Sequence, residues 1–233
     1  MKPYQQIRIL ECGEPLVAIP TYQFAVETPH PYEKLGAPYG DRSPYHLRQG
    51  VLDRLVSAQA RLQQRYPGWL IQIFDAYRPI AVQQFMVNYA FNQLLADRQL
   101  TLSSLSDAQQ QALWEEVYQF WALPSHDPAT PPPHSTGAAI DVTLVDATGQ
   151  PVDMGGAIDE ISPCSHPDYY THSTDPQQQT YHHHRQLLHQ IMAEAGFCRH
   201  PNEWWHFSYG DQLWAWQQQQ QSQTLVTARY GAV

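Results

Sequence analysis

Apolar residues in the first half of the chain recur with the spacing of helices and strands. Between residues 47 and 62 they fall near a 3.6-residue period, which predicts a helix that Pro67-Gly68 ends. The continuous apolar run over 69–74 contains β-branched residues and predicts a strand. Pro79 suits the first turn of a second helix, which we expect to continue to about Ala96. Residues 1–45, rich in Pro, Tyr and Gly, predict strands and loops.

The second half of the chain alternates short apolar segments with polar loops. Ser106 and Gln109 form a capping-box pair that predicts the start of another helix, and residues 124–133 form a proline-rich extended loop. Three more elements are predicted: a strand over 138–145 followed by a turn and a second strand, a helix over about 178–195, and a strand over 203–209. Helices that precede and interrupt a small, mainly antiparallel sheet indicate an α+β fold.

Composition and charge narrow the class of protein. Hydrophobic residues make up 42% of the 233 positions, which is sufficient for a sizeable core. The formal net charge of −9, with no basic run, argues against nucleic acid and anionic membranes as partners. No apolar stretch is long enough for a membrane span, and the first residues do not resemble a secretory signal. Three cysteines without a C-x-x-C pair favour a reducing compartment, so we expect a cytoplasmic location, with the periplasm as the alternative.

Two short motifs contain residue types that bind metal ions. His134 lies seven residues before Asp141, and Asp141 interrupts an apolar predicted strand, where an unpaired carboxylate is costly to bury. A metal ion would remove that cost, and Gly137 allows the intervening backbone to turn. His206 would complete a set of three ligands that leaves one position open for water, as in catalytic zinc sites. Arg78, considered next, precedes the 124–133 loop and these three residues follow it, so the candidate chemistry lies on both sides of the loop, which favours a single domain over 1–233.

Two further residues suit catalysis of hydrolysis. Glu203 stands three residues before His206 and can act as the base for the water at the zinc, provided that it lies on the loop entering the last strand. Arg78 follows a buried strand and can stabilise an oxyanion, with Asp75 or Tyr77 orienting it.

Each motif also has an ordinary structural explanation. The Asp-x-Tyr-Arg turn could be a salt bridge, and Asp141 could be satisfied by backbone donors. The run His182–His184 looks like a metal cluster, but consecutive helical residues point about 100° apart and cannot share one ion. The combination of the three motifs, more than any one of them, favours a metal-dependent hydrolase.

The ordered motifs resemble those of the D-alanyl-D-alanine dipeptidases, a branch of the zinc D-Ala-D-Ala metallopeptidases. The resemblance covers roughly residues 65–210 and rests on DAYRP (75–79), HSTGAAIDVTL (134–144), DMGGAID (153–159), SH (165–166), RQLLHQIMAEAGF (185–197) and EWWHF (203–207). It implies an α+β fold, one catalytic zinc ion per chain, and hydrolysis of the D-Ala-D-Ala dipeptide as the activity. By resemblance, the ligands are His134, Asp141 and His206, the base is Glu203, and the transition-state arginine is Arg78. The family carboxylate that receives the substrate's amino group corresponds to Asp159.

Departures from the family pattern bear on specificity. The family often has a serine and a basic residue directly before the first ligand, where this chain has Pro132 and Pro133, so a contact from that serine to substrate is not carried over. Related D,D- or L,D-carboxypeptidases, which act on peptidoglycan peptides, tend to read Glu-Pro-Trp-His at the second motif, so Trp204 favours the dipeptidase. A non-catalytic zinc-binding domain of this fold would lack the base or the arginine, and both are present. Recycling of wall-derived dipeptide and its removal before wall synthesis are both compatible with this activity.

Overall fold

The structure, a computed structural model, describes residues 2–233. The helices are α1 (Pro31–Lys34), α2 (Gln49–Arg65), α3 (Ile80–Asp97), α4 (Asp107–Phe120), α5 (Pro176–Glu194) and α6 (Gln212–Ser222). The strands are β1 (Leu16–Ala18), β2 (Ala25–Val26), β3 (His46–Arg48), β4 (Leu70–Asp75), β5 (Ala139–Val145), β6 (Cys198–Arg199) and β7 (His206–Ser208). Among the short 3₁₀ helices, η1 (Pro3–Gln6) and η4 (Pro133–Thr136) lie close to the site described below.

The strands form one small mixed sheet and one separate pair. The five-stranded sheet has the order β2-β4-β5-β7-β6, and all its neighbours are antiparallel except β2 and β4, which are parallel. Strands β1 and β3 pair with each other outside this sheet. The predicted α+β class, with a mainly antiparallel sheet flanked by helices, is therefore confirmed.

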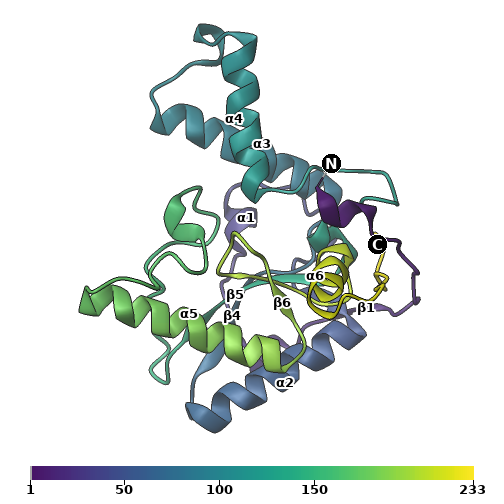
Figure 1. The fold of residues 1–233 in the computed structure, drawn as a ribbon, viewed down its shortest axis with the longest axis vertical. Coiled ribbons are helices and arrows are strands. Elements are labelled where there is room, and N and C mark those ends of the chain that lie inside the picture. The colour runs from purple at the N-terminus through teal and green to yellow at the C-terminus, as the bar shows by residue number, and fades with distance from the viewer. Residues whose placement is uncertain (1) are drawn as a thin grey trace.

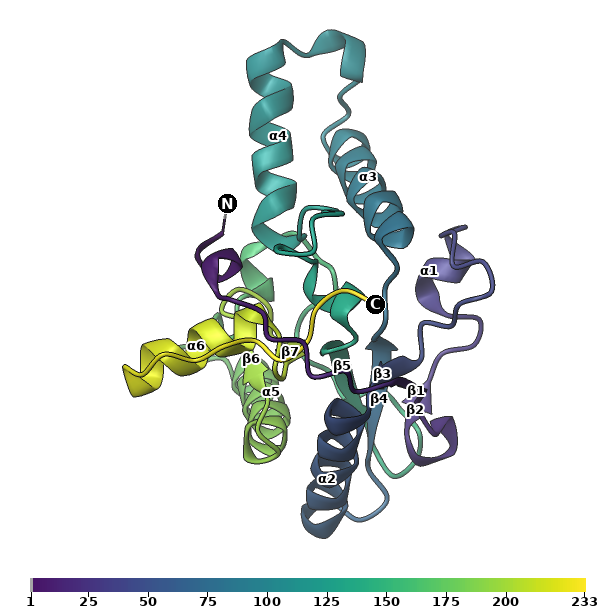
Figure 2. The ribbon, with the colours of Figure 1, turned by 90° about the vertical axis from the view of Figure 1, so that its right-hand side faces the viewer.

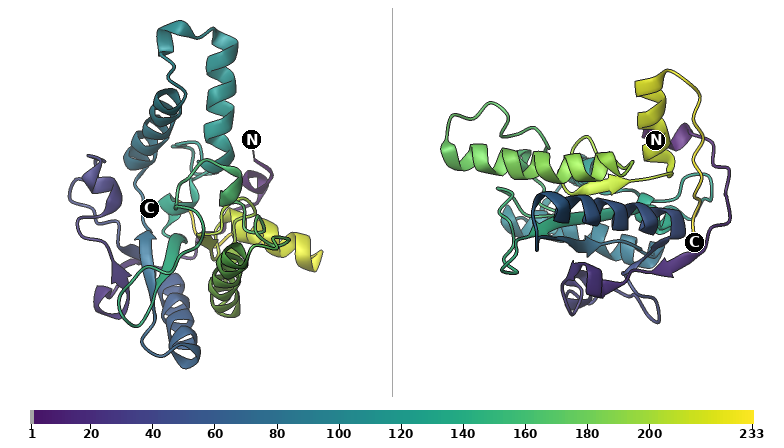
Figure 3. Two further views of the ribbon diagram at one scale, coloured as in Figure 1. Left: turned by 90° about the vertical axis from the view of Figure 1, so that its left-hand side faces the viewer. Right: turned by 90° about the horizontal axis from the view of Figure 1, so that it is seen from below.

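Helices α2 and α5 pack against each other and against the sheet (Figures 1 and 3). The apolar face of α2 contains fully buried Val51, Leu55 and Leu62, as its 3.6-residue period predicts. Strand β5 is buried almost throughout, so its apolar residues face both the helices and the interior of the protein. One apolar cluster fills this region and holds the central strands of the sheet in place.

Helices α3 and α4 form a hairpin that projects from the sheet (Figure 2). A second apolar cluster holds the two helices together, with Phe91 and Trp114 stacked at a ring separation of 4.0 Å. The capping box at the start of α4 is present, since Ser106 Oγ accepts from the Gln109 N–H. The base of this hairpin supplies one wall of the candidate site.

Some sequence predictions for individual elements were wrong. The second strand expected after the turn at 146–149 is a single bridge between Val145 and Pro151, because proline has no N–H to continue a ladder. The strand predicted over 203–209 is confined to His206–Ser208, since residues 201–205 form a loop. The N-terminal region also contains the one-turn helix α1, which its composition did not predict.

Two other expectations from the sequence concern the cysteines and membrane-spanning helices. The three cysteines are free thiols, as the sequence indicated. Within residues 2–233, no helix has both the length and the apolar character that crossing a membrane requires.

Candidate active site

Three residues of the site are aligned across adjacent strands of the sheet. Asp75 of β4 pairs in register with Asp141 of β5, and Asp141 pairs with His206 of β7. Side chains at directly opposed positions share one face of a sheet, so the register brings these groups together. His134 comes from η4, and Gly137 ends that turn with φ +70°, which returns the chain to β5.

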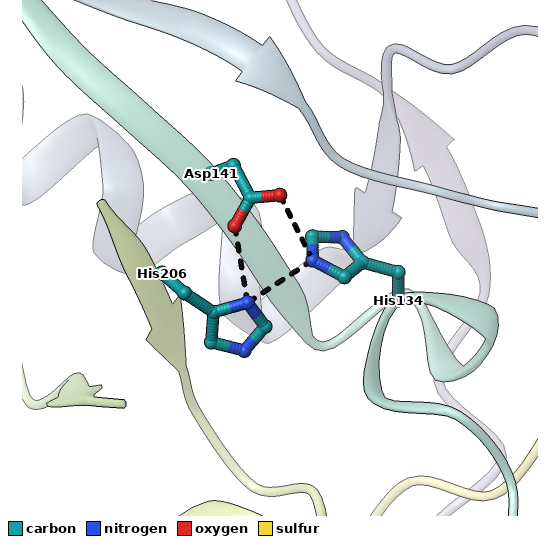
Figure 4. A group of neighbouring side chains, drawn as sticks. All are labelled: His134, Asp141 and His206. Atoms are coloured by element: carbon teal, nitrogen blue, oxygen red, sulfur yellow. Dashed lines mark hydrogen bonds and ion pairs between the residues drawn. The ribbon is translucent and has the colours of Figure 1, made fainter. Parts of the chain in front are cut away.

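His134, Asp141 and His206 form a compact set of possible metal donors (Figure 4). His134 Nε2 lies 3.2 Å from His206 Nδ1 and 3.2 Å from Asp141 Oδ2, and His206 Nδ1 lies 3.0 Å from Asp141 Oδ1. In a tetrahedral zinc site with bonds of about 2.0–2.1 Å, neighbouring donors lie about 3.3 Å apart. The spacing and the chemistry of these buried donors therefore fit zinc.

Hydrogen bonds on the far side of each imidazole support this arrangement. His134 Nδ1 lies 2.7 Å from the carbonyl oxygen of Ala76, so its N–H can donate there and leave Nε2 free as a ligand. His206 Nε2 lies 3.3 Å from Ser208 Oγ, which leaves Nδ1 directed at the other donors. Both ring orientations are thus fixed by neighbours before any metal ion binds.

Glu203 lies beside the donors on the loop that enters β7, where the sequence placed it. Its Oε2 is 3.7 Å from His206 Nδ1, which is farther than the spacing among the three donors. The side chain is buried, and Oε1 has no hydrogen-bond partner among the described residues. Burial, reinforced by the nearby Asp141 carboxylate, raises the pKa of Glu203 well above its usual value. A carboxylate with a raised pKa is a stronger base, so Glu203 is suited to general base catalysis.

Arg78 is held rigidly directly after β4. Its Nε lies 2.9 Å from Asp75 Oδ2, its Nη1 lies 2.9 Å from Gln83 Oε1, and its Nη2 lies 3.1 Å from the Tyr32 hydroxyl. The same Nη2 lies 3.4 Å from Asp141 Oδ2, so the guanidinium is next to the possible metal donors. Of the two residues expected to orient Arg78, Asp75 does so.

Tyr77, the other candidate for orienting Arg78, is directed elsewhere. Its hydroxyl contacts the Arg42 guanidinium and lies 3.4 Å from the Val233 carbonyl oxygen. Tyr77 therefore does not orient Arg78.

Asp159 closes another part of the same cavity. Its Oδ2 accepts a hydrogen bond of 2.6 Å from the Tyr32 hydroxyl, and its backbone is left-handed with φ +65°. Burial, with a smaller contribution from the Asp141 carboxylate, raises the pKa of Asp159 to about 7. A bound cation would favour the ionised form of this carboxyl group.

The sequence motifs missed several residues from the N-terminal region. The Tyr32 hydroxyl bridges Arg78 and Asp159, while His30 Nε2 and the Tyr39 hydroxyl lie 3.2 Å and 3.1 Å from Asp75 Oδ1. Lys2 and Tyr4 also line the cavity, together with Arg78, Gln83, Phe120, Trp121, Ala122, Pro133, His134, Asp141, Asp159, His200, Glu203, Trp205, His206 and Leu213. These residues lie far in sequence from the motifs and follow no periodic pattern, so the sequence did not point to them. The run His182–His184 lies on α5 and contributes no residue to this cavity.

The buried His-Asp-His donor set suits a metallopeptidase, and comparisons with known proteins identify the family. The sequence model of the D-Ala-D-Ala dipeptidase family matches residues 25–226, and the chain belongs to this family of peptidases. A D-alanyl-D-alanine dipeptidase of Synechocystis sp. is 53% identical over 226 residues, which cover 94% of this chain and 92% of that protein.

More distant relatives match shorter segments. A D-alanyl-D-alanine dipeptidase of Escherichia coli is 45% identical over 74 residues, covering 32% of this chain and 36% of that protein. Another, from Streptomyces coelicolor, is 39% identical over 77 residues, covering 32% of this chain and 35% of that protein. The resemblance deduced from the motifs is therefore confirmed.

Proposed function

We propose that this chain is a zinc-dependent dipeptidase that hydrolyses free D-Ala-D-Ala, with one zinc ion per chain held by His134, Asp141 and His206. The observation that carries the proposal is the convergence of three buried donor atoms, 3.0–3.2 Å apart, beside the buried carboxylate of Glu203. The substrate follows from membership of the family and from the similar protein of Synechocystis.

The roles of the protein groups follow from their positions around the donors. Zinc at this position would polarise the scissile carbonyl and lower the pKa of a water molecule. Glu203 takes a proton from the attacking water and delivers it to the departing amine, since its carboxylate is next to the donors and has a raised pKa. Arg78 stabilises the negative charge that develops on the carbonyl oxygen, because its rigid guanidinium lies beside Asp141.

Asp159 supports a preference for a free dipeptide. The ammonium group of a dipeptide is two bonds from the scissile carbonyl carbon, so its receptor must lie close to the catalytic groups. Asp159 meets this requirement through Tyr32, whose hydroxyl contacts both Asp159 and Arg78. A charge-assisted hydrogen bond to the ammonium would contribute about 1.5–3 kcal/mol to binding, and an N-acylated substrate would lose it.

The chain acts on this small molecule as a single domain. Support comes from the cavity itself, whose lining residues run from Lys2 to Leu213. The three free thiols support a cytoplasmic location.

Metal analysis of variants tests the zinc site. We expect one zinc ion per chain in the wild type, and strongly reduced zinc and activity in His134→Ala, Asp141→Ala and His206→Ala. His183→Ala is the matched control, because this exposed histidine on α5 lies outside the cavity and should leave zinc unchanged. Full zinc occupancy in His206→Ala would refute the assigned ligand set.

Substrate comparison tests the dipeptidase activity separately. The wild type should cleave D-Ala-D-Ala and cleave N-acetyl-D-Ala-D-Ala poorly. Asp159→Asn should lower kcat/KM for the free dipeptide while zinc content stays at the wild-type value. Efficient cleavage of the acetylated substrate would instead indicate a carboxypeptidase.

A further inference from the structure

The candidate cavity contains two side chains with a strongly basic cationic group, and only one of them is engaged by the protein. Arg78 contacts Asp75, Gln83, Tyr32 and Asp141, as described above. The other is Lys2, which precedes η1 and lines the same cavity. Among residues 2–233, Lys2 forms no ion pair, whereas Lys34, the other lysine of the sequence, is paired with Glu27. The Lys2 ammonium is therefore available to a ligand.

The N-terminal segment brings Lys2 to the cavity through its contacts with α6. Helix η1 packs against α6, and the Gln212 side-chain amide donates to the carbonyl oxygen of Ile7 at 2.7 Å. Tyr4, which belongs to η1, is buried and lines the cavity together with Lys2. Burial lowers the pKa of Lys2, while the Glu203 carboxylate opposes this shift. A partly desolvated ammonium of this kind favours an anionic partner.

Lys2 and Asp159 reach the cavity from different segments of the chain. Lys2 belongs to the N-terminal segment that packs against α6, whereas Asp159 is hydrogen-bonded to Tyr32, whose hydroxyl also contacts Arg78. In D-Ala-D-Ala, the carboxylate carbon is two bonds from the departing nitrogen, which must lie near Glu203 to be protonated. The ammonium group is at the opposite end of the dipeptide, near the position proposed for Asp159.

We propose that Lys2 binds the C-terminal carboxylate of the dipeptide and so fixes the departing residue beside Glu203. This inference rests on the proposed dipeptidase function. Pro132 and Pro133 precede the first ligand and have no side-chain donor, so that segment does not provide a side-chain contact to the carboxylate. With Asp159 at one end and Lys2 at the other, the site recognises both charges of a free dipeptide.

The test combines a change in the protein with a change in the substrate. Lys2→Met removes the charge, Lys2→Arg keeps it, and Lys34→Met is the control for loss of a lysine outside the cavity. Each protein is assayed without an N-terminal tag on D-Ala-D-Ala and on its C-terminal amide, which has no carboxylate. Zinc content and thermal unfolding are measured in parallel.

We expect Lys2→Met to raise KM for the free dipeptide roughly 10- to 100-fold, the range for a hydrogen bond between charged groups. Its kcat should change much less, and zinc content should stay constant. On the amide, wild type and Lys2→Met should be nearly equal, because the contact is already missing. Lys2→Arg should recover most of the affinity, and Lys34→Met should match the wild type.

Other outcomes separate this inference from the proposed function. Equal losses on both substrates would overturn the assignment and indicate that Lys2 acts through Glu203 or the fold. An unchanged KM for the free dipeptide would overturn it as well. If Lys2→Met folds poorly, the wild type and Lys2→Arg still test the assignment. The wild type must cleave the free dipeptide better than the amide, and Lys2→Arg must keep this preference. A wild type that cleaves neither substrate would contradict the dipeptidase function itself.

Discussion

Replacing Arg78 with lysine keeps a positive charge but removes the planar guanidinium that connects several buried groups. A lysine ammonium can remain near Asp75, yet it cannot also reach Gln83 and Tyr32 with the geometry of the guanidinium, whose Nη atoms lie 2.9 Å and 3.1 Å from them. Both lost hydrogen bonds have the charged guanidinium as donor, so at about 1.5–3 kcal/mol each we expect a loss of about 3–6 kcal/mol in the free energy of unfolding.

The catalytic effect of Arg78→Lys is measured separately from this structural effect, on protein that is still folded. Loss of one well-placed oxyanion donor lowers kcat by roughly 10²- to 10³-fold, whereas zinc content should not change. We would measure kcat and KM for D-Ala-D-Ala, zinc content, and urea-induced unfolding of the same preparations. Arg98→Lys is the matched control, because Arg98 pairs with Glu116 on the surface of the α3–α4 hairpin.

The result that would refute this reasoning is a kcat for Arg78→Lys within tenfold of the wild type. Arg78 would then be a structural residue that neutralises Asp75. A large fall in zinc content would also argue against a separate role at the oxyanion, since it would show that Arg78 acts by holding Asp141 in place.

Three further predictions concern other parts of the structure. Glu203→Gln should keep zinc and lower kcat by roughly 10²- to 10⁴-fold, measured by metal analysis and kinetics, and loss of zinc would make Glu203 a ligand. Gly137→Ala should lower urea stability by more than about 1 kcal/mol, because its Cβ would lie 2.5 Å from Leu16 Cδ1 at φ +70°; Gly149→Ala, with open space at φ +81°, should cost less, and equal losses would contradict the steric argument. Burial lowers the pKa of His189 to about 4, so the unfolded chain binds this proton first as pH falls below 6.5. Wild-type stability should therefore decrease between about pH 6.5 and 4, and His189→Gln should show a smaller decrease in urea unfolding; identical pH dependence would exclude this contribution.

Much of the local structure could be predicted because each element depends on residues near it in sequence. The period of apolar positions placed α2, and the Ser106–Gln109 pair placed the start of α4. The same reasoning failed after the turn at 146–149, where the turn suggested a second strand but Pro151 supports only one bridge. The length of a strand depends on the neighbouring strand with which it pairs, and a local sequence pattern does not describe that neighbour.

The candidate donors were visible in the sequence because their residue types are unusual in their surroundings. Asp141 interrupts an apolar strand, and Gly137 marks the turn between it and His134. The resemblance to a known family added Asp159, which composition alone would have left as an ordinary loop carboxylate. That these groups meet depends on the register between β5 and β7, which places Asp141 opposite His206.

The sequence by itself determined the four longest helices, the main strands, the family and the residues expected to perform the chemistry. Only the tertiary structure decided which distant groups surround them. Tyr32 joins Arg78 to Asp159 across 46 and 127 residues, and Lys2 reaches a cavity whose last lining residue is Leu213. Such contacts arise when the hydrophobic core closes and brings separate segments together, so they leave no periodic or short-range pattern in the chain.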